Sequence, residues 1–246
     1  MKTKIFCDSA DFQTIKKLNN NPLVDGFTTN PSLMRKAGAK DYKKYSQKIL
    51  KICRKKPISL EVFGDTDRQM LRQAEIINSW GKNIYVKIPV VNSKGFFSGK
   101  VIRTLSAKNI KLNITAVYTV KQVKNIIKCI NKKSNIIISI FSGRMSDVGK
   151  DPIPIIKESV RITKKFKNVK ILWASTREAY NYLQAKKYEC SIITMPPEII
   201  EKISKFGKTY NELTLDTVRK FLKDSQDSNF RIKLENISFL ACKINY

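Results

Sequence analysis

Lys87 interrupts an otherwise apolar stretch of the chain, Asn83-Ile84-Tyr85-Val86-Lys87-Ile88-Pro89-Val90. A cation buried in such a stretch must leave water, and desolvation disfavours its charged form. The neutral amine that results is a nucleophile, as Schiff-base formation with a carbonyl compound requires. The alternative is a lysine at the rim of a sheet or barrel, with its stem packed and its ammonium group in water.

Polar side chains also occur at the ends of the other apolar runs. The carboxyl ends of parallel strands gather at one edge of a sheet, where ligand sites commonly form. There we place Asp8, Thr28, Thr29, Asn30, Glu61, Asn113, Thr115, Ser139, Arg144, Ser175 and Arg177. Side chains two residues apart share a face of a strand, which pairs Ser59 with Glu61, Asn113 with Thr115, and Ser139 with Phe141. If these faces point inward, carboxylates, hydroxyls and amides surround the Lys87 amine.

Short apolar runs that predict strands alternate with segments of helical periodicity. The predicted strands are Lys4–Cys7, Gly26–Thr29, Ile58–Phe63, Asn83–Pro89, Lys111–Thr115, Asn135–Phe141, Lys170–Ala174 and Ser191–Met195. Strands that alternate with helices over about 250 residues are typical of an α/β fold of the (β/α)8 TIM-barrel type. The rival is an open doubly wound sheet, but neither GxGxxG nor GxxxxGK[ST] occurs in the sequence.

Composition excludes several kinds of site. Histidine is absent, which removes Ser-His-Asp and Cys-His catalysis and any His-ligated metal. The five cysteines are far apart and form no CxxC pair, so reduced thiols of a cytoplasmic protein are expected. The chain has 48 Lys+Arg against 20 Asp+Glu, but this charge is scattered and has no aromatic-interleaved basic motif. We therefore expect no nucleic acid partner, and a basic barrel that binds polyanions is the non-enzymatic alternative.

The chain also lacks an apolar run long enough to span a bilayer, and its first residues lack the features of a signal peptide. We therefore expect a cytoplasmic protein with no membrane partner. Residues 1–234 are predicted to form one barrel domain that includes a helix at Leu215–Leu222, and residues 235–246 an extension of unknown role.

Four segments, in the right order, resemble the transaldolase family. They are Asp25-Gly26-Phe27-Thr28-Thr29-Asn30-Pro31-Ser32, Tyr85-Val86-Lys87-Ile88-Pro89, Asn113-Ile114-Thr115 and Ala174-Ser175-Thr176-Arg177. The resemblance implies a class I aldol mechanism on sugar phosphates, without metal or cofactor. By that resemblance, the Lys87 amine attacks the C2 carbonyl of a ketose phosphate and keeps a dihydroxyacetone unit as an enamine until an acceptor aldehyde takes it.

The resemblance also assigns roles to the residues around Lys87. Asp8 corresponds to the carboxylate that handles the C4 hydroxyl proton, and Glu61 and Thr115 to a pair that relays protons through a water. Asn30, Asn113 and Ser175 correspond to residues that hold the dihydroxyacetone hydroxyls, and Arg144 and Arg177 to the phosphate site. Arginine suits that site because its planar fork makes bidentate bonds to phosphate oxygens. Thr29, Ser139 and Phe141 are expected to line the pocket.

Related small barrels include fructose-6-phosphate aldolases, which release free dihydroxyacetone. Those enzymes typically have glutamine at the position of Glu61 and tyrosine at that of Phe141, so both positions here favour a transaldolase. The chain departs from many relatives at Thr176, where they have phenylalanine. Compact relatives are often ring-shaped homo-oligomers, and we expect this chain to form a homo-oligomer as well.

Overall fold

The computed structural model describes residues 2–232. The chain divides into two compact units, with the boundary between Ser204 and Lys205. The first unit holds every residue that the sequence assigns to the site, and the second holds the helix predicted at Leu215–Leu222, which is part of α11 (Tyr210–Asp227). The predicted domain boundary between residues 234 and 235 lies outside the described residues and stays a prediction.

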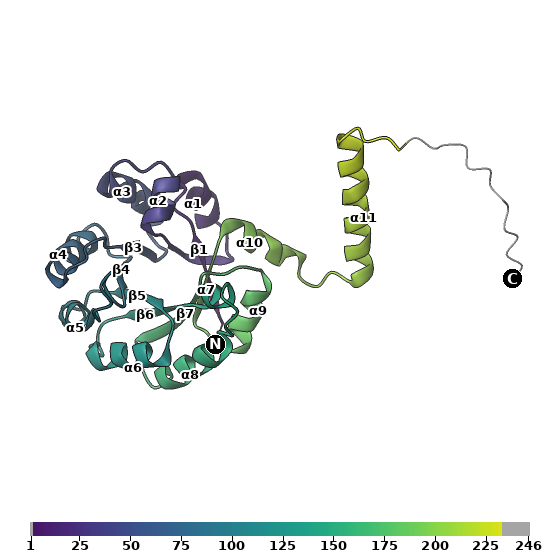
Figure 1. Ribbon diagram of the computed structural model, residues 1–246. Coiled ribbons are helices and arrows are strands. Elements are labelled where there is room, and N and C mark those ends of the chain that lie inside the picture. Colours follow the sequence, from purple (N-terminus) through teal and green to yellow (C-terminus); the bar gives the residue numbers. More distant parts are fainter. Residues whose placement is uncertain (1, 233–246) are drawn as a thin grey trace, which may run out of the picture. The chain divides into compact units, whose positions relative to one another are not determined.

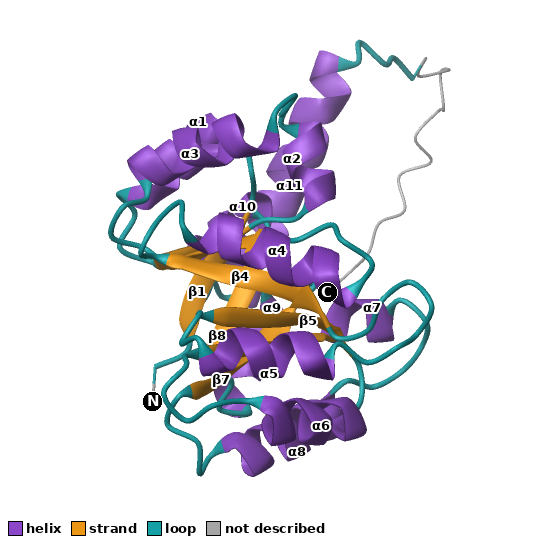
Figure 2. Ribbon diagram, turned by 90° about the vertical axis from the view of Figure 1, so that its left-hand side faces the viewer, coloured by secondary structure: helices purple, strands orange, loops and turns teal. Residues whose placement is uncertain are grey.

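The first unit is built on eight parallel strands that close into a barrel in chain order, with helices around them (Figures 1 and 2). The strands are β1 (Lys4–Asp8), β2 (Val24–Thr28), β3 (Ile58–Glu61), β4 (Ile84–Pro89), β5 (Leu112–Val117), β6 (Ile136–Phe141), β7 (Val169–Ala174) and β8 (Ile192–Met195). The predicted (β/α)8 TIM barrel is confirmed, and the open doubly wound sheet is wrong because β1 pairs with β8.

Helices follow the strands and cover the outside of the barrel (Figure 1). They are α1 (Phe12–Asn19), α2 (Pro31–Lys36), α3 (Tyr42–Ile52), α4 (Asp67–Asn78), α5 (Gly99–Ala107), α6 (Val120–Cys129), α7 (Ser142–Ser146), α8 (Ile153–Thr163), α9 (Tyr180–Lys187) and α10 (Pro197–Lys202), then a 3-10 turn, Ile203–Lys205. The local sequence explains where several helices begin. Asp11 and Asp41 accept the N-cap hydrogen bonds of α1 and α3, and Thr66 and Thr119 form capping boxes at the start of α4 and α6.

Successive side chains of each strand point alternately to the outside and to the inside of the barrel. The outward side chains form one apolar layer, and the inward ones form an apolar layer and a polar layer. The larger core lies between strands and helices, and a second cluster, made of Phe6, Ile137, Leu172, Ala174 and Ile192, is separate from it. Phe6, Ile137 and Ile192 lie two residues before Asp8, Ser139 and Thr194 on the same strands, and Leu172 lies two residues before Ala174; the later residue of each pair lines the pocket described below. The barrel interior therefore has an apolar floor and a polar mouth, and Gly26 leaves room for Phe6, whose ring lies 2.7 Å from the place of a Cβ.

Strand ends differ from the predicted ones by at most two residues, and the reasons are local. The predicted run Ile58–Phe63 ends at Glu61 because the Phe63 N–H donates to the Gln73 side chain (2.8 Å) and leaves the ladder. Strand β5, which was predicted to end at Thr115, continues to Val117. These shifts leave the polar residues at the carboxyl ends of the strands, as predicted.

Two further properties bear on the sequence predictions. Cys7, Cys53, Cys129 and Cys190 are buried free thiols, while Cys242 lies outside the described residues. Burial raises the pKa of Cys7 and Cys190 to about 12 and that of Cys53 to about 11, so these thiols are unreactive at neutral pH. Among residues 2–232, no helix has both the length and the apolar character needed to cross a membrane.

Candidate active site

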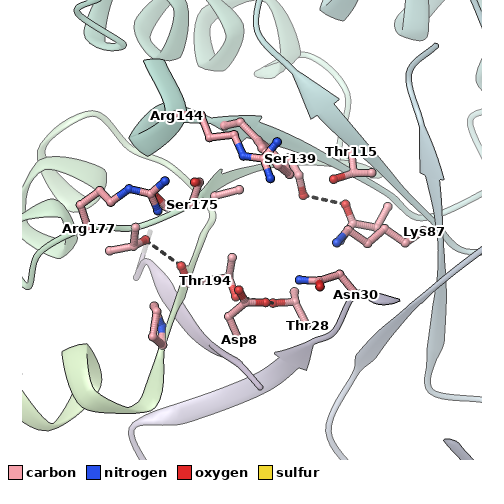
Figure 3. A pocket seen from close by; sticks show the side chains of 15 residues that line it. Asp8, Thr28, Asn30, Lys87, Thr115, Ser139, Arg144, Ser175, Arg177 and Thr194 are labelled. Carbon is pink, nitrogen blue, oxygen red and sulfur yellow. Dashed lines mark hydrogen bonds between the residues drawn. The ribbon is translucent and has the colours of Figure 1, made fainter. Parts of the chain in front are cut away.

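A pocket opens at the carboxyl ends of the strands, inside the mouth of the barrel (Figure 3). Its walls come from Asp8, Thr28, Asn30, Lys87, Asn113, Thr115, Ser139, Phe141, Arg144, Ala174, Ser175, Thr176, Arg177, Thr194 and Pro196. In Figure 3 Arg177 and Ser175 lie on the side of the pocket opposite Lys87, and Arg144 lies between them and Lys87, near Ser139. The pocket thus has an anion-binding end and an amine end.

Lys87 is held by two hydrogen-bond acceptors. Its side chain is only 8% exposed, and Nζ lies 3.1 Å from Glu61 Oε2 and donates to the carbonyl oxygen of Thr29 at 3.1 Å. The barrel register accounts for the pair, since Glu61 on β3 stands beside Lys87 on β4. A carboxylate at this distance is placed to accept a proton from the Lys87 ammonium group.

Asp8 is fixed by two threonines from neighbouring strands. The Thr28 hydroxyl donates to Asp8 Oδ1 (2.7 Å), and the same hydroxyl is hydrogen-bonded to that of Thr194. Burial raises the pKa of the Asp8 carboxyl from its ordinary 3.8, against the opposing effects of Lys87 and the Thr28 bond. Asp8 does not cap a helix, because the N-cap of α1 is Asp11. A carboxyl with a raised pKa at the end of a strand is suited to proton transfer.

A short chain of hydrogen bonds crosses the floor of the polar layer. Ser139 Oγ donates to Asn113 Oδ1 (2.6 Å), and Asn113 Nδ2 donates to Ser59 Oγ (3.0 Å). This orients the Asn113 amide. Thr115 lies two residues after Asn113 on the same face of β5. Its hydroxyl is buried and has no hydrogen-bond partner among the described residues. Thr115 lines the pocket together with Lys87.

Asn30 serves both the fold and the pocket. It is the N-cap of α2, where its Oδ1 accepts from the Leu33 N–H at 2.9 Å. The resemblance assigns this residue to substrate binding. The structure shows the capping bond, and because that bond uses only the oxygen, the amide nitrogen of Asn30 remains as a donor at the pocket wall.

Two arginines form the anion-binding end. The Arg144 guanidinium stacks over the Phe141 ring, 5.3 Å from its centroid. Arg177 donates from Nε to Asp147 Oδ1 (2.9 Å) and from Nη2 to Oδ2 (2.5 Å), and Nη1 donates to the Ser175 carbonyl (3.2 Å). The bond with Asp147 raises the pKa of Arg177 and lowers that of Asp147. Both cations are thereby oriented before any anion binds.

Most of the predicted site residues lie together, and the pocket also includes three threonines that the prediction omitted or left unassigned. Glu61 lies in an adjoining opening that shares Lys87 and Thr115 with the main pocket. Thr29 contributes its carbonyl to Lys87, whereas its hydroxyl donates to Ser59 O (2.9 Å) and points away from the pocket wall. Thr28, Thr176 and Thr194 line the pocket. Thr194 sits near the end of the last predicted strand, so the rule that found the other residues applies to it as well.

Comparison with known proteins bears on this site. The family model described as transaldolase/fructose-6-phosphate aldolase matches residues 5–237. The chain belongs to this family. A probable transaldolase of Nitrosopumilus maritimus is 32% identical over 237 residues, which cover 95% of this chain and 97% of that protein. A probable transaldolase of Thermoplasma volcanium is 35% identical, over 93% of this chain and 100% of that protein.

Solved structures of low identity share the barrel alone. A putative phosphonomutase from Burkholderia cenocepacia superposes with a TM-score of 0.56 at 9% identity, over 89% of this chain and 93% of that one. A structure titled native KDPGal gives a TM-score of 0.54 at 10% identity, over 93% and 96% of the two chains. At these identities the likeness shows the fold, whereas membership of the transaldolase/fructose-6-phosphate aldolase family rests on the sequence matches.

Proposed function

We propose that the protein is a transaldolase, which transfers a dihydroxyacetone unit from a ketose phosphate to an aldose phosphate through a Schiff base on Lys87. The observation that carries the proposal is the position of the Lys87 amine, which is buried in the barrel mouth, 3.1 Å from Glu61, in a pocket that Arg144 and Arg177 also line. Family membership supports the same activity.

Schiff-base formation begins when the Lys87 amine loses a proton, and Glu61 Oε2 is the nearest carboxylate oxygen to accept it. The free amine then attacks C2 of the ketose, which gives a carbinolamine. Loss of the C2 hydroxyl as water, with a proton returned from Glu61, leaves the iminium. The Thr115 hydroxyl borders the same space and can donate to or accept from the departing water.

Asp8 acts in the cleavage of the carbon–carbon bond. Its carboxylate accepts the proton of the C4 hydroxyl while the C3–C4 bond breaks, and the electron pair moves into the iminium to form an enamine. The aldose phosphate leaves, and the enamine carbon later attacks the acceptor aldehyde in the reverse sequence. Thr28 supports this role because its hydroxyl fixes the Asp8 oxygen at 2.7 Å.

Substrate binding uses the two ends of the pocket. Arg144 and Arg177 bind the phosphate, for which their charge and planar donors are suited. Asn30, Asn113 and Ser175 bind the hydroxyls of the dihydroxyacetone unit, and Ser139 orients the Asn113 amide through its 2.6 Å bond. Thr29 contributes through its carbonyl oxygen, which holds the Lys87 amine.

Transfer to an acceptor requires that the enamine is not protonated and released first. Phe141 lines the pocket on the side of Arg144 and contributes only a ring, which stacks edge-on against Tyr118 at 5.8 Å. A phenylalanine has no hydroxyl that can deliver a proton to the enamine. The aldolase alternative, with release of free dihydroxyacetone, is therefore not the function that we propose.

The proposal extends to the setting of the reaction. We propose the pentose phosphate pathway as that setting, because its reactions transfer three-carbon units between sugar phosphates, and the cytoplasm as the location, which the buried free thiols support. We also propose a homo-oligomer, since α11 carries Leu215, Val218 and Leu222 at the helical spacing of an apolar stripe. Light scattering of the purified protein would test the assembly, and a monomer at all concentrations would contradict it.

A turnover assay tests the proposed reaction. The protein is incubated with fructose 6-phosphate and erythrose 4-phosphate, and the products are separated by mass spectrometry. We expect sedoheptulose 7-phosphate and glyceraldehyde 3-phosphate in equal amounts. Steady release of free dihydroxyacetone without an acceptor would instead establish an aldolase, and salt-sensitive binding of polyanions without turnover would favour the non-enzymatic barrel.

A further inference from the structure

The end of β3 lacks a strand neighbour on one side. Alternate residues of a parallel strand direct their backbone groups to the same neighbour, so Pro57, Ser59 and Glu61 all face β2. Pro57 O and Ser59 O accept from the N–H groups of Phe27 (2.8 Å) and Thr29 (3.2 Å). The chain then turns into α2 at Pro31, and β2 provides no partner for Glu61.

Tyr42, at the start of α3, takes the place of the missing strand. Its hydroxyl donates to the carbonyl oxygen of Glu61 (3.1 Å) and accepts from the N–H of Glu61 (3.0 Å). Burial raises the pKa of Tyr42, so the phenol keeps its proton and remains a donor. Its ring packs edge-on against Phe63 (4.6 Å between centroids) and also contacts Trp80 (6.0 Å). One hydroxyl therefore satisfies both backbone groups of Glu61.

This contact links α3 to the amine end of the pocket. The Glu61 carboxylate lies 3.1 Å from Lys87 Nζ, and its direction depends on where the end of β3 is held. We propose that Tyr42 is a positioning residue for the Glu61 carboxylate in the formation and hydrolysis of the Lys87 Schiff base. The inference rests on the proposed function, because it concerns the proton transfer assigned to Glu61.

Tyr42→Phe isolates the hydroxyl, since phenylalanine keeps the ring contacts with Phe63 and Trp80. Tyr45 provides a matched control on the same helix. It too is partly exposed, and its hydroxyl donates to a backbone carbonyl, Ala10 O, at 3.0 Å; neither Tyr45 nor Ala10 lines the pocket. Tyr45→Phe thus removes a comparable hydrogen bond from α3 without touching the end of β3.

The experiment measures the rate at which borohydride fixes dihydroxyacetone on Lys87, together with kcat and KM for fructose 6-phosphate with erythrose 4-phosphate as acceptor. The comparison includes wild type, Tyr42→Phe and Tyr45→Phe, each made in two backgrounds: one that keeps Glu61 and one that carries Glu61→Gln. All are assayed below their melting temperatures. We expect Tyr42→Phe to lower the trapping rate and kcat ~10-fold, less than the ~10²-fold or more contributed by a general base. KM should stay within about twofold, because Tyr42 does not line the pocket.

The two backgrounds separate positioning from general damage. In the Glu61→Gln background, Tyr42→Phe should cause no further loss, because the carboxylate on which it acts is already absent. Any one of three results would overturn the inference without refuting the proposed function. They are unchanged rates in Tyr42→Phe, an equal loss of rate in Tyr45→Phe, and the same ~10-fold loss from Tyr42→Phe in both backgrounds. If wild type gives no adduct on Lys87, the proposed function fails, and the inference fails with it.

Discussion

Replacement of Gly143 by alanine should disrupt the phosphate end of the site. Gly143 immediately precedes Arg144 in α7, and a Cβ on it would lie 1.6 Å from the backbone oxygen of Ser175 and 2.8 Å from its carbonyl carbon. Contacts of a real Cβ start at 3.0 Å, so the two segments must move apart by about 1.4 Å. Ser175 already has a left-handed backbone (φ 64°), which leaves this turn little freedom to adjust.

The movement affects both arginines, since Arg144 follows Gly143 and Arg177 lies two residues after Ser175. A misplacement of ~1 Å at an active site costs about 10²-fold in rate, and overpacking costs roughly 1–3 kcal/mol of stability. We therefore expect kcat/KM for fructose 6-phosphate to fall on the order of 10²-fold in Gly143→Ala. Lys87 should still form an adduct with dihydroxyacetone, since the atoms nearest the added Cβ belong to Ser175 and Arg177 and not to β3 or β4. The adduct should form more slowly, because Ser175 also moves.

Gly81→Ala is the control. Gly81 also lacks a positive φ, and its nearest neighbours would be side-chain atoms, Asn83 Oδ1 at 3.3 Å and Ile84 Cδ1 at 3.6 Å, far from the pocket residues in the fold. The assay compares kcat/KM for fructose 6-phosphate and thermal melting of both variants. A folded Gly143→Ala protein with the kcat/KM of Gly81→Ala would refute the reasoning that α7 and the turn after β7 place the two arginines.

Two further substitutions test the electrostatics. Because burial raises the Asp8 pKa above 3.8, the protonated carboxyl contributes stability below pH 3.8 that is lost as pH rises through the folded-state pKa. The free energy of unfolding of wild type, measured with urea, should therefore fall relative to that of Asp8→Asn as the pH rises above about 4, and the kcat of Asp8→Asn should be lower than that of wild type. A stability difference that does not change with pH would contradict this. Arg177→Lys keeps the charge but loses the planar fork bound to Asp147, so KM for fructose 6-phosphate should rise about tenfold, the value of a charge-assisted hydrogen bond. A KM equal to that of wild type would show that Arg177 does not bind the phosphate.

Alternation and strand order were enough to predict much of the site. Strands in parallel order bring their carboxyl ends together, so Asp8, Lys87 and Asn113 were expected in one pocket, and the structure places them there. Alternation was less informative where two similar residues are adjacent. Thr29 was predicted to line the pocket, but the structure places Thr28 there, with its hydroxyl bonded to Asp8, while the Thr29 hydroxyl donates to Ser59 O.

Contacts between side chains and a distant backbone escape such reasoning. Tyr42 falls on the apolar face of a helical pattern together with Tyr45, and nothing in that pattern distinguishes the two. Only the folded barrel shows that one hydroxyl reaches Glu61 and the other Ala10. The pair of Arg177 with Asp147 is likewise set by the approach of two loops, which no periodicity describes.

Covalent trapping on Lys87 tests the central claim most directly. The protein is treated with borohydride in the presence of fructose 6-phosphate or dihydroxyacetone, digested, and searched for the modified peptide, with Lys87→Met as the control. We predict a reduced dihydroxyacetone adduct on Lys87, dependent on the sugar and absent from Lys87→Met. A folded wild-type protein that turns over fructose 6-phosphate without any adduct on Lys87 would contradict the account.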